Sequence, residues 1–474
     1  MRWPQGRLLA VVFSGLAACH SNTPAVDAAV DAGPSDLGVV DAGQPPRWPR
    51  TLAPASVMAP SPGRWLRTII HAHSVHSHDA CDGNPYVDGG PNEPCLQSFR
   101  RALCTVKIDT VFLTEHAERI SMVPFTTVLQ MRDGDEPIIE GGQTVGSRIR
   151  CDDGHRVMIL PGAENELMPI GLRRHPTEIE GSLERAYHDD GAAGAARFRE
   201  AGALIAVPHC EQQTRDQLRG TNPDVIESYN IHANLDPRIA DRVLGLPLGQ
   251  ILPDTIAFSQ AARGLDPEWM FLAIFRENHL DLAHWAAFAA EGRRYVAVGG
   301  SDVHENSFPA IFPDGERGDS YRRVLRWYSN FVRVDGEVTR ESMMAGVAAG
   351  RLYTVFEAYG TPEGFGLTAG EATVGDTVML ARQPQFQVTV PRVYGLDPSL
   401  PRPDVRVRLL KAELNGTWRE LAASAETLRF TPTEPGAYRA EALITPHHAR
   451  PYIPRMERLI REVPWVYSNV MRVE

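Results

Sequence analysis

The sequence predicts an α/β domain over residues 64–355, followed by a smaller antiparallel β domain over residues 356–474. In the first region, short apolar runs of strand length alternate with stretches compatible with helices, which is typical of βα units. In the second region, alternating runs such as Phe386–Val390 and Val405–Leu410 stand between Gly and Pro turns. Strict alternation with short spacing favours an antiparallel β-sandwich.

Six apolar runs predict the strands of the α/β domain: Trp65 to Ile70, Thr110 to Thr114, Val157 to Leu160, Ala203 to Val207, Val225 to Ser228 and Tyr295 to Val298. Each run leads into polar side chains that can bind metal, transfer protons or contact substrate. In α/β barrels the site forms where strands end and the following loops begin, so we expect these side chains to converge. Taken singly, Glu115 as a helix cap, His209 as a core residue or Asp302 as a turn residue has a structural explanation. Six such coincidences at the same topological place are improbable.

The densest stretch of metal-binding side chains is His71 to Asp79, which holds four histidines within eight residues. His71 and His73 close an apolar run, and residues i and i+2 of a strand point to the same face. We therefore expect both imidazoles to bind one metal ion. His78 and Asp79 follow in the loop and offer further ligands.

Five short motifs follow one another along residues 64–355: His71-Ala72-His73-Ser74 with His78-Asp79, Leu113-Thr114-Glu115-His116, Gly162-Ala163-Glu164, Val207-Pro208-His209 and Gly300-Ser301-Asp302-Val303-His304. In order and spacing they resemble the motifs of PHP (polymerase and histidinol phosphatase) metallohydrolases, in particular the secreted, carbaryl-hydrolase-like branch. The resemblance implies a distorted (βα)7 barrel that holds two or three divalent metal ions at its C-terminal mouth.

The resemblance also implies a set of metal ligands. One metal ion would be held by His71, His73, Glu164 and Asp302. Glu164 would bridge to a second ion held by His209, and a third ion would be held by His116, His304 and the residue at position 78. Because this chain has His78 followed by Asp79 where the family usually has Asp, either residue is a candidate.

Four further residues are weak candidates for the site. No histidine cleanly matches the second-metal position after Glu164, and His175 is the candidate for it. The others are Glu115, which stands beside His116, and Asn230 and His232, which follow the fifth strand.

Mixed imidazole and carboxylate ligands suit Zn, Mn or Fe better than Mg or Ca. The expected enzyme is a phosphoesterase that acts on small molecules through a metal-bridged hydroxide, with Asp302 or His304 passing a proton to the leaving group. Hydrolysis of another ester, amide or carbamate bond is an alternative, since the same nucleophile attacks carbonyls. A non-catalytic surface lipoprotein that binds a ligand is a third reading.

The charge balance bears on partners. The chain of 474 residues has 48 basic and 59 acidic residues, a net charge of −11. This excess of acid argues against nucleic acid or anionic lipid as main partners and leaves a small-molecule ester, expected to be phosphorylated.

The N-terminus predicts export. Residues 1–19 have a basic start, a short apolar core and the ending Leu16-Ala17-Ala18-Cys19, which resembles a bacterial lipobox and makes Cys19 the expected lipidation site. An ordinary signal peptide is the alternative. Residues 20–63 lack an apolar period and predict a disordered tether. We expect a lipid anchor in the cell envelope as the sole membrane contact, and this anchor would lie in the outer membrane if the cell is Gram-negative.

The remaining five cysteines suit an oxidising compartment. Cys81 and Cys95 bracket a loop rich in Gly, Pro and Asn and are the first pair to test, although the connectivity stays open. Cys210, beside His209, is a candidate free thiol near the site.

Overall fold

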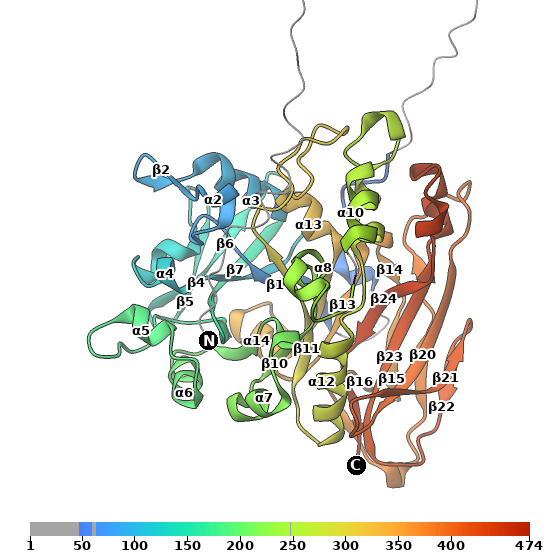
Figure 1. Cartoon of the computed structure of the whole chain (residues 1–474). Coiled ribbons are helices and arrows are strands. Elements are labelled where there is room, and N and C mark those ends of the chain that lie inside the picture. The colour runs from blue at the N-terminus through green and yellow to red at the C-terminus, as the bar shows by residue number, and fades with distance from the viewer. Residues whose placement is uncertain (1–46, 59–62, 247) are drawn as a thin grey trace, which may run out of the picture.

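The computed structural model describes residues 47–58, 63–246 and 248–474. The predicted signal peptide, Cys19 and most of the predicted tether lie outside these residues. In Figure 1 the α/β part occupies the blue-to-yellow range, and the long strands of the C-terminal part, orange to red, stand beside it.

Seven strands form a closed barrel: β1 (Arg64–Ala72), β4 (Thr110–His116), β7 (Arg156–Glu164), β8 (Met168–Ile170), β9 (Leu204–Val207), β10 (Val225–Asn230) and β11 (Val296–Val303). Each strand pairs with the next, and β11 pairs with β1 to close the ring. Six of the seven run parallel. The six predicted apolar runs are these six strands, and the predicted α/β barrel is confirmed.

The seventh strand is what distorts the barrel. β8 is three residues long and runs antiparallel to both β7 and β9. The parallel strands are buried along almost their whole length, as in β4 and β10, because both faces of the barrel wall are covered. Their carboxyl ends therefore meet at one mouth.

Helices and small strands fill the connections between the barrel strands, and two further helices, α13 and α14, come after the last barrel strand, β11. The helices are α2 (Ala80–Gly83), α3 (Glu93–Thr105), α4 (Ala117–Ile120), α5 (Leu183–Tyr187), α6 (Ala192–Glu200), α7 (Arg215–Thr221), α8 (Ile231–Leu235), α9 (Pro237–Ala240), α10 (Leu248–Ala257), α11 (Phe271–Ile274), α12 (His279–Ala290), α13 (Tyr321–Trp327) and α14 (Arg340–Ala348). The added strands are β2 (Tyr86–Val87), β3 (Gly90–Pro91), β5 (Glu136–Glu140) and β6 (Gln143–Arg150). Local sequence sets several helix starts, such as the capping box of Thr214 and Gln217 that begins α7.

The C-terminal part is a β-sandwich, as predicted. Its larger sheet contains β12 (Ser329–Val334), β13 (Leu352–Val355), β17 (Thr377–Val378), β20 (Asp404–Ala412), β21 (Trp418–Ser424), β23 (Gly436–Thr445), β24 (Val463–Ser468) and β25 (Met471–Val473). The smaller sheet contains β15 (Gly366–Ala369), β16 (Ala372–Thr373), β18 (Phe386–Thr389) and β22 (Leu428–Phe430). Phe386 of the smaller sheet packs edge-on against Tyr438 of the larger one, with ring centroids 5.3 Å apart.

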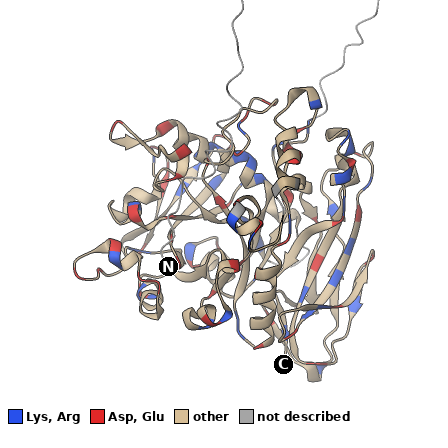
Figure 2. Ribbon diagram, in the orientation of Figure 1, with Lys and Arg blue, Asp and Glu red and all other residues tan. Residues whose placement is uncertain are grey.

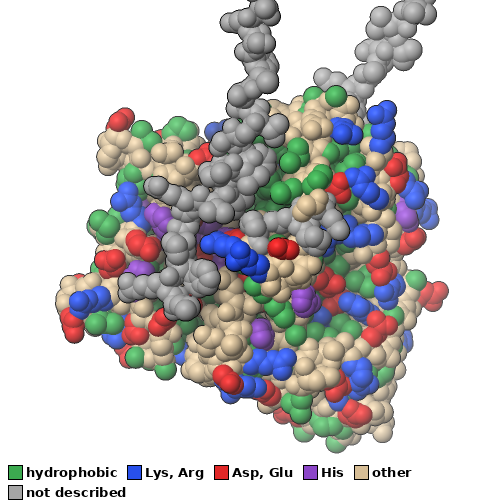
Figure 3. All heavy atoms as spheres, viewed as in Figure 1, with side chains coloured by type: hydrophobic (Ala, Val, Ile, Leu, Met, Phe, Trp, Pro, Cys, Tyr) green, Lys and Arg blue, Asp and Glu red, His purple; other side chains and the backbone are tan. Residues whose placement is uncertain are grey.

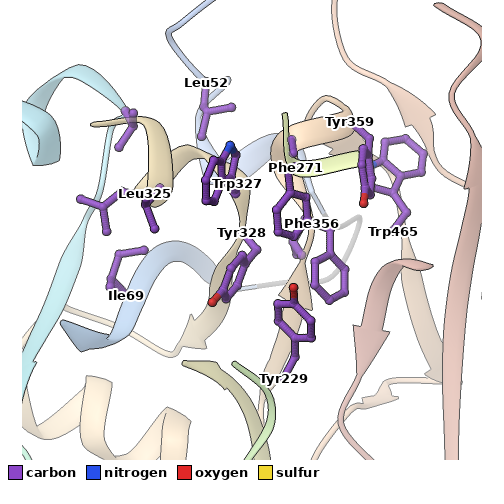
Figure 4. Close-up of a cluster of buried hydrophobic side chains, with 14 of the residues drawn as sticks. Leu52, Ile69, Tyr229, Phe271, Leu325, Trp327, Tyr328, Phe356, Tyr359 and Trp465 are labelled. Atoms are coloured by element: carbon purple, nitrogen blue, oxygen red, sulfur yellow. The ribbon is translucent and has the colours of Figure 1, made fainter. Parts of the chain in front are cut away.

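The two parts share one continuous sheet. β12 pairs with the first half of β1, β13 pairs with β12, and β24 pairs with β13. This ladder crosses the predicted division at residues 355 and 356. An aromatic core that includes Phe271, Tyr328, Phe356 and Trp465 fills the space between the barrel and the C-terminal strands (Figure 4).

Residues 47–58 correct the predicted extent of the tether. Trp48, Leu52, Ala55 and Met58 are buried in the main core, and the Trp48 indole lies 4.8 Å from that of Trp269. The tether prediction of 20–63 is wrong for this segment, because these apolar side chains anchor it to the folded part.

Two disulfides are present, Cys81–Cys95 and Cys104–Cys151, and Cys210 is a buried free thiol. Acidic and basic positions are interspersed along the ribbons of the described residues (Figure 2). None of the described helices combines the length and the apolar character needed to cross a bilayer.

Candidate metal centre

The strand ends bring imidazoles and carboxylates together at the barrel mouth. The densest group comprises His71, His73, Glu164 and Asp302, from the ends of β1, β7 and β11. The two Nε2 atoms of His71 and His73 lie 3.1 Å apart. His71 Nε2 lies 3.2 Å from a carboxylate oxygen of Glu164 and 3.2 Å from one of Asp302, and His73 Nε2 lies 3.3 Å from each carboxylate. All four side chains are almost fully buried.

A second group shares the two carboxylates. His232 Nδ1 lies 2.9 Å from Asp302 Oδ2, and His209 Nε2 lies 3.6 Å from the same oxygen. His209 Nε2 also lies 3.3 Å from Glu164 Oε1. Glu164 and Asp302 therefore face both groups.

A third group lies on the other side of His73. It contains His73, His116 and His304, and Asp79 Oδ1 lies 3.3 Å from His116 Nε2 and 3.4 Å from His304 Nε2. His116 Nδ1 lies 3.4 Å from Glu164 Oε2, which connects this group to the first.

Buried neighbours fix the orientation of the central imidazoles. Glu227 Oε1 lies 2.6 Å from His71 Nδ1, and Ser77 Oγ lies 2.7 Å from His73 Nδ1. Ser77 Oγ in turn donates a hydrogen bond of 2.8 Å to Glu115. These contacts leave Nε2 of both rings directed at the carboxylates, which is how partners behind metal-ligating histidines work in general.

The backbone at the site is unusual. His71, His209 and Asp302 have φ values of 69°, 50° and 47°. Such conformations of residues other than glycine cost on the order of 1–3 kcal/mol each and persist where the surroundings determine them. The positive φ of His71 coincides with register shifts between β1 and both of its parallel neighbours. Backbone strain therefore coincides with the candidate ligands.

The two central carboxylates stay ionised, which favours the binding of cations. Burial raises the pKa of Glu164 and Asp302, but the charge of His71 and the hydrogen bonds from histidines hold both values well below the usual range. Burial lowers the pKa of His116 and His209, yet the Asp79 carboxylate beside His116 and the Glu164 carboxylate beside His209, with further carboxylate charges nearby, raise both to about 9. Burial lowers the pKa of His304 to about 4, against the charge of Asp79.

Orphaned atoms show that the residues fit divalent metal ions. Asp79 Oδ1 and His304 Nε2 are buried, lie 3.4 Å apart, and have no hydrogen-bond partner among the described residues. An atom pair of this kind is costly in a protein interior unless something coordinates it. Imidazole nitrogens and carboxylate oxygens together suit Zn, Mn or Fe.

Two predicted candidates lie outside the three groups. The His78 side chain is 46% exposed and lies at the edge of the site, where its ring centroid is 4.8 Å from that of His116 and it forms a further group with His116 and Glu118. Asp79 is the residue that lies within 3.4 Å of both His116 and His304. His175 is away from the site: its ring nitrogens contact the Tyr187 hydroxyl at 2.9 Å and the Val123 carbonyl at 3.0 Å. The suggestion of His175 as a metal ligand is wrong, because both of its ring nitrogens already contact other protein groups away from the barrel mouth.

The other weak candidates have distinct places. His232 stands in the second group, where the sequence showed no clear histidine. Asn230 donates to Glu227 Oε2 and accepts from the backbone N–H of His232, so it supports the site from behind. Glu115 accepts hydrogen bonds from Ser74 and Ser77 and is fully buried. Metal binding by the full predicted set of ligands stays a prediction.

Sequence reasoning did not single out Glu227. It lies in the middle of β10, fully buried, between two strands of apolar sequence. A carboxylate directly after the apolar pair Val225-Ile226 of a predicted strand was the available signal, since such a group needs a partner when it is buried. Its partners are the candidate ligand His71 and the backbone N–H of His209, at 2.6 and 2.9 Å.

Comparisons with known proteins give little direct guidance. No family model matches the chain. No curated protein matches it either. Among solved structures, a two-domain protein from Bacteroides vulgatus that contains a predicted PHP-like metal-dependent phosphoesterase is similar, with a TM-score of 0.34 and 13% sequence identity over 90% of this chain and 100% of that chain. Since one fold serves many functions, the side chains at the barrel mouth are what bear on the activity.

Proposed function

We propose that this chain is a metal-dependent phosphoesterase that hydrolyses small-molecule esters. The supporting observation is that two buried carboxylates, Glu164 and Asp302, each face more than one group of histidines at the barrel mouth. Shared carboxylates between neighbouring cation sites suit the two-metal hydrolysis of phosphate esters.

The residues that would hold the metals follow from the three groups: His71, His73, Glu164 and Asp302; His209 and His232 with the same carboxylates; and Asp79, His116 and His304. Bound divalent cations would lower the pKa of water and stabilise negative charge on the attacked ester. Glu227 and Ser77 hold the central imidazoles in place. Asp302 and His304 also border the recess beside the cluster, and we retain them as the residues that move a proton to the leaving group.

Hydrolysis of a carboxylic ester, amide or carbamate is the second candidate. One observation favours it: the described residues that line the recess beside the cluster include no Lys or Arg. A phosphate would then depend on the metals alone for its positive partners, whereas a carbonyl needs no further cation.

We also propose that the protein is exported and anchored through Cys19. Two disulfides within the α/β part support an oxidising compartment. In cells that express the full chain, Cys19→Ala should move the protein from the membrane fraction to the soluble fraction. Membrane retention of this variant would contradict the anchor.

Metal content and turnover test the enzymatic proposal. The purified chain should contain two or three Zn, Mn or Fe ions and should release p-nitrophenol from p-nitrophenyl phosphate faster than from p-nitrophenyl acetate. The double substitution His71→Ala with His73→Ala should lose at least one ion and nearly all turnover. His447→Ala, in the β domain, is the matched control and should keep both. A wild-type chain that binds fewer than about one ion, with no activity after Zn or Mn is added, would favour a non-catalytic binding protein.

A further inference from the structure

A buried carboxylate, Glu211, lies behind the candidate metal ligand His209. It belongs to the short 3-10 helix Cys210–Gln212, and its Oε1 lies 3.8 Å from His209 Nδ1. Both atoms are buried, and neither has a hydrogen-bond partner among the described residues. Nε2 of the same ring faces Glu164 and Asp302. The two nitrogens of His209 therefore point to different carboxylates.

Metal binding through Nε2 makes Nδ1 of His209 a hydrogen-bond donor. A neutral imidazole carries one proton, and when Nε2 binds a cation that proton is on Nδ1. A buried N–H group without an acceptor is costly. Glu211 Oε1 is the acceptor that faces it, and the step from 3.8 Å to an ordinary hydrogen bond is a shift of about 0.9 Å. The His209 side chain is 18% exposed, which leaves it room for this shift.

Glu211 is held on its far side by α12. The Asn278 side-chain N–H donates to Glu211 Oε2 at 3.2 Å, and Asn278 also caps α12 by accepting from the backbone N–H of Asp281. Histidine side chains reach the surface on the face viewed in Figure 3, whereas Glu211 is almost fully buried. The carboxylate therefore has a fixed position from which it can orient the His209 ring.

Asp281, in the first turn of α12, adds a proton donor beside Glu211. It is fully buried, its two carboxyl oxygens have no hydrogen-bond partner, and no ion pair with a basic side chain involves it in the described part of the chain. Two charged carboxylates without a cation between them are unfavourable in a protein interior. Burial and the charges of Glu211 and Glu227 raise the pKa of Asp281 well above its usual range. Asp281 therefore keeps its proton and can donate it to Glu211.

We propose that Glu211 is the positioning residue of His209. It accepts a hydrogen bond from Nδ1–H, so that Nε2 stays free for the cation of the second group, and Asp281 supports it as a neutral hydrogen-bond donor. The proposal rests on the proposed metal-dependent function and adds to it two residues that touch neither substrate nor cation.

Metal affinity in matched variants tests this pair. Competition with a chelator measures the affinity of the purified full chain for each Zn ion. Glu211→Gln should weaken one ion roughly 10–100-fold, as the loss of a partner behind a metal ligand generally does. Asp281→Asn should keep the affinity within about twofold, because its amide N–H can still donate to Glu211, whereas Asp281→Leu should weaken the same ion. Glu341→Gln, at an exposed position in the first turn of α14, is the control and should change nothing.

The outcomes separate this proposal from the proposed function. Unchanged Zn affinity in a folded Glu211→Gln variant would overturn the positioning role, and so would an equal loss in Asp281→Asn and Asp281→Leu, which a merely structural role predicts. If Glu211→Gln does not fold, the two Asp281 variants give the decision. In each of these cases the wild type still binds its ions, and the proposed function stands.

A double-mutant cycle decides if the wild-type chain binds no ion. The proposed function then fails, and the cycle compares Glu211→Gln, His209→Ala and the double variant by urea denaturation of the metal-free chain. Effects on the midpoint that do not add would support the contact, because the two side chains then interact. Additive effects would overturn it.

Discussion

At the scale of single residues, Glu227 connects His71 of the first candidate metal group with the backbone of His209 in the second. One of its oxygens contacts His71, and the other accepts hydrogen bonds from the backbone of His209 and the side chain of Asn230. Gly300 on β11 lies against the same carboxylate, where an added Cβ would stand 1.7 Å from Glu227 Oε1. The position of His71 therefore depends on a carboxylate and on the empty space beside it.

Replacing this carboxylate should weaken metal binding more than it weakens the fold. Glu227→Gln keeps the shape but removes the negative charge that faces His71, and we expect metal affinity to fall roughly 10–100-fold. Titration of the metal-free protein with Zn, followed by calorimetry, measures the change. Unchanged affinity in a folded variant would remove Glu227 from the site.

A methyl group at Gly300 should displace Glu227. Gly300→Ala forces the carboxylate away from His71, and overpacking of this kind destabilises a fold by roughly 1–3 kcal/mol. Gly220→Ala is the control, because no atom lies within 4 Å of the added Cβ. Urea denaturation should show a loss of stability for the first variant and none for the second. Equal stability of both variants would contradict the packing described here.

The sequence alone predicted some of these residues and missed others for a physical reason. His71 and His73 close an apolar run, and strand periodicity puts them on one face. Glu164 and Asp302 each come after an apolar run with three residues in between, and the resemblance of their motifs marked them as ligands. His232 and His175 both lie outside the apolar runs that predict strands, and nothing in their local sequence tells which one turns toward the barrel mouth. Only the path of α8 after β10 brings His232 to within 2.9 Å of Asp302.

At the scale of elements, the Cys81–Cys95 disulfide holds the loop that carries Asp79. The Cys81 backbone N–H donates to the His304 carbonyl at 3.0 Å, so the same short helix, α2, touches both sides of the third metal group. The Cys104–Cys151 disulfide joins the end of α3 to the residue that follows β6, and it closes a longer stretch of chain.

The two disulfides should therefore have different effects. Replacing Cys81 and Cys95 by Ser should lower the number of bound ions by one at limiting metal, because Asp79 is no longer held against His116 and His304. Replacing Cys104 and Cys151 by Ser should cost roughly 3–4 kcal/mol of stability and leave the metal count unchanged. Metal analysis and urea denaturation of both double variants give the comparison. The same metal count in both would contradict the role assigned to the first disulfide.

A strand could be predicted where its own sequence has a regular hydrophobic pattern. The six long parallel strands are continuous apolar runs, and the sandwich strands alternate. β8 has three residues and no pattern of its own, and it is a strand only because β7 and β9 pair with it. Tertiary pairing of this kind is not encoded in local sequence.

At the scale of the whole molecule, the β domain is a fixed part of the structure. Arg439 on β23 is buried between Trp285 of α12, Trp418 of β21 and Tyr467 of β24, with its guanidinium carbon 4.9, 4.6 and 5.1 Å from the ring centroids. Its charge is paired with Glu441. In Figure 1, α12 lies between the barrel strands and the long C-terminal strands.

The free energy of unfolding should depend on pH through His448, a buried histidine of the C-terminal part. Burial lowers the pKa of His448 to about 4, against a hydrogen bond with the Tyr359 carbonyl. The folded-state pKa is below the unfolded value of about 6.5, so its contribution is complete above pH 6.5 and is lost as the pH falls toward 4, by up to about 1.4 kcal/mol per pH unit. The difference in unfolding free energy between wild type and His448→Gln should shrink from pH 7 to pH 5. A difference that is constant with pH would contradict this.

The N-terminal boundary shows where composition misleads. A segment rich in Ala and Pro has no hydrophobic periodicity. The Trp48 ring nevertheless packs beside the Trp269 ring, and the backbone N–H of Trp48 donates to Asp266 at 2.5 Å. A single large side chain can anchor a segment that composition assigns to a tether.

The central claim is that side chains from the ends of six separate barrel strands bind a shared cluster of cations. Anomalous diffraction from crystals of the Zn-loaded or Mn-loaded chain tests it most directly. The expected result is two or three peaks at the barrel mouth, with Glu164 and Asp302 each bound to more than one ion. Peaks elsewhere on the protein, with none between these two carboxylates and His71, would contradict it.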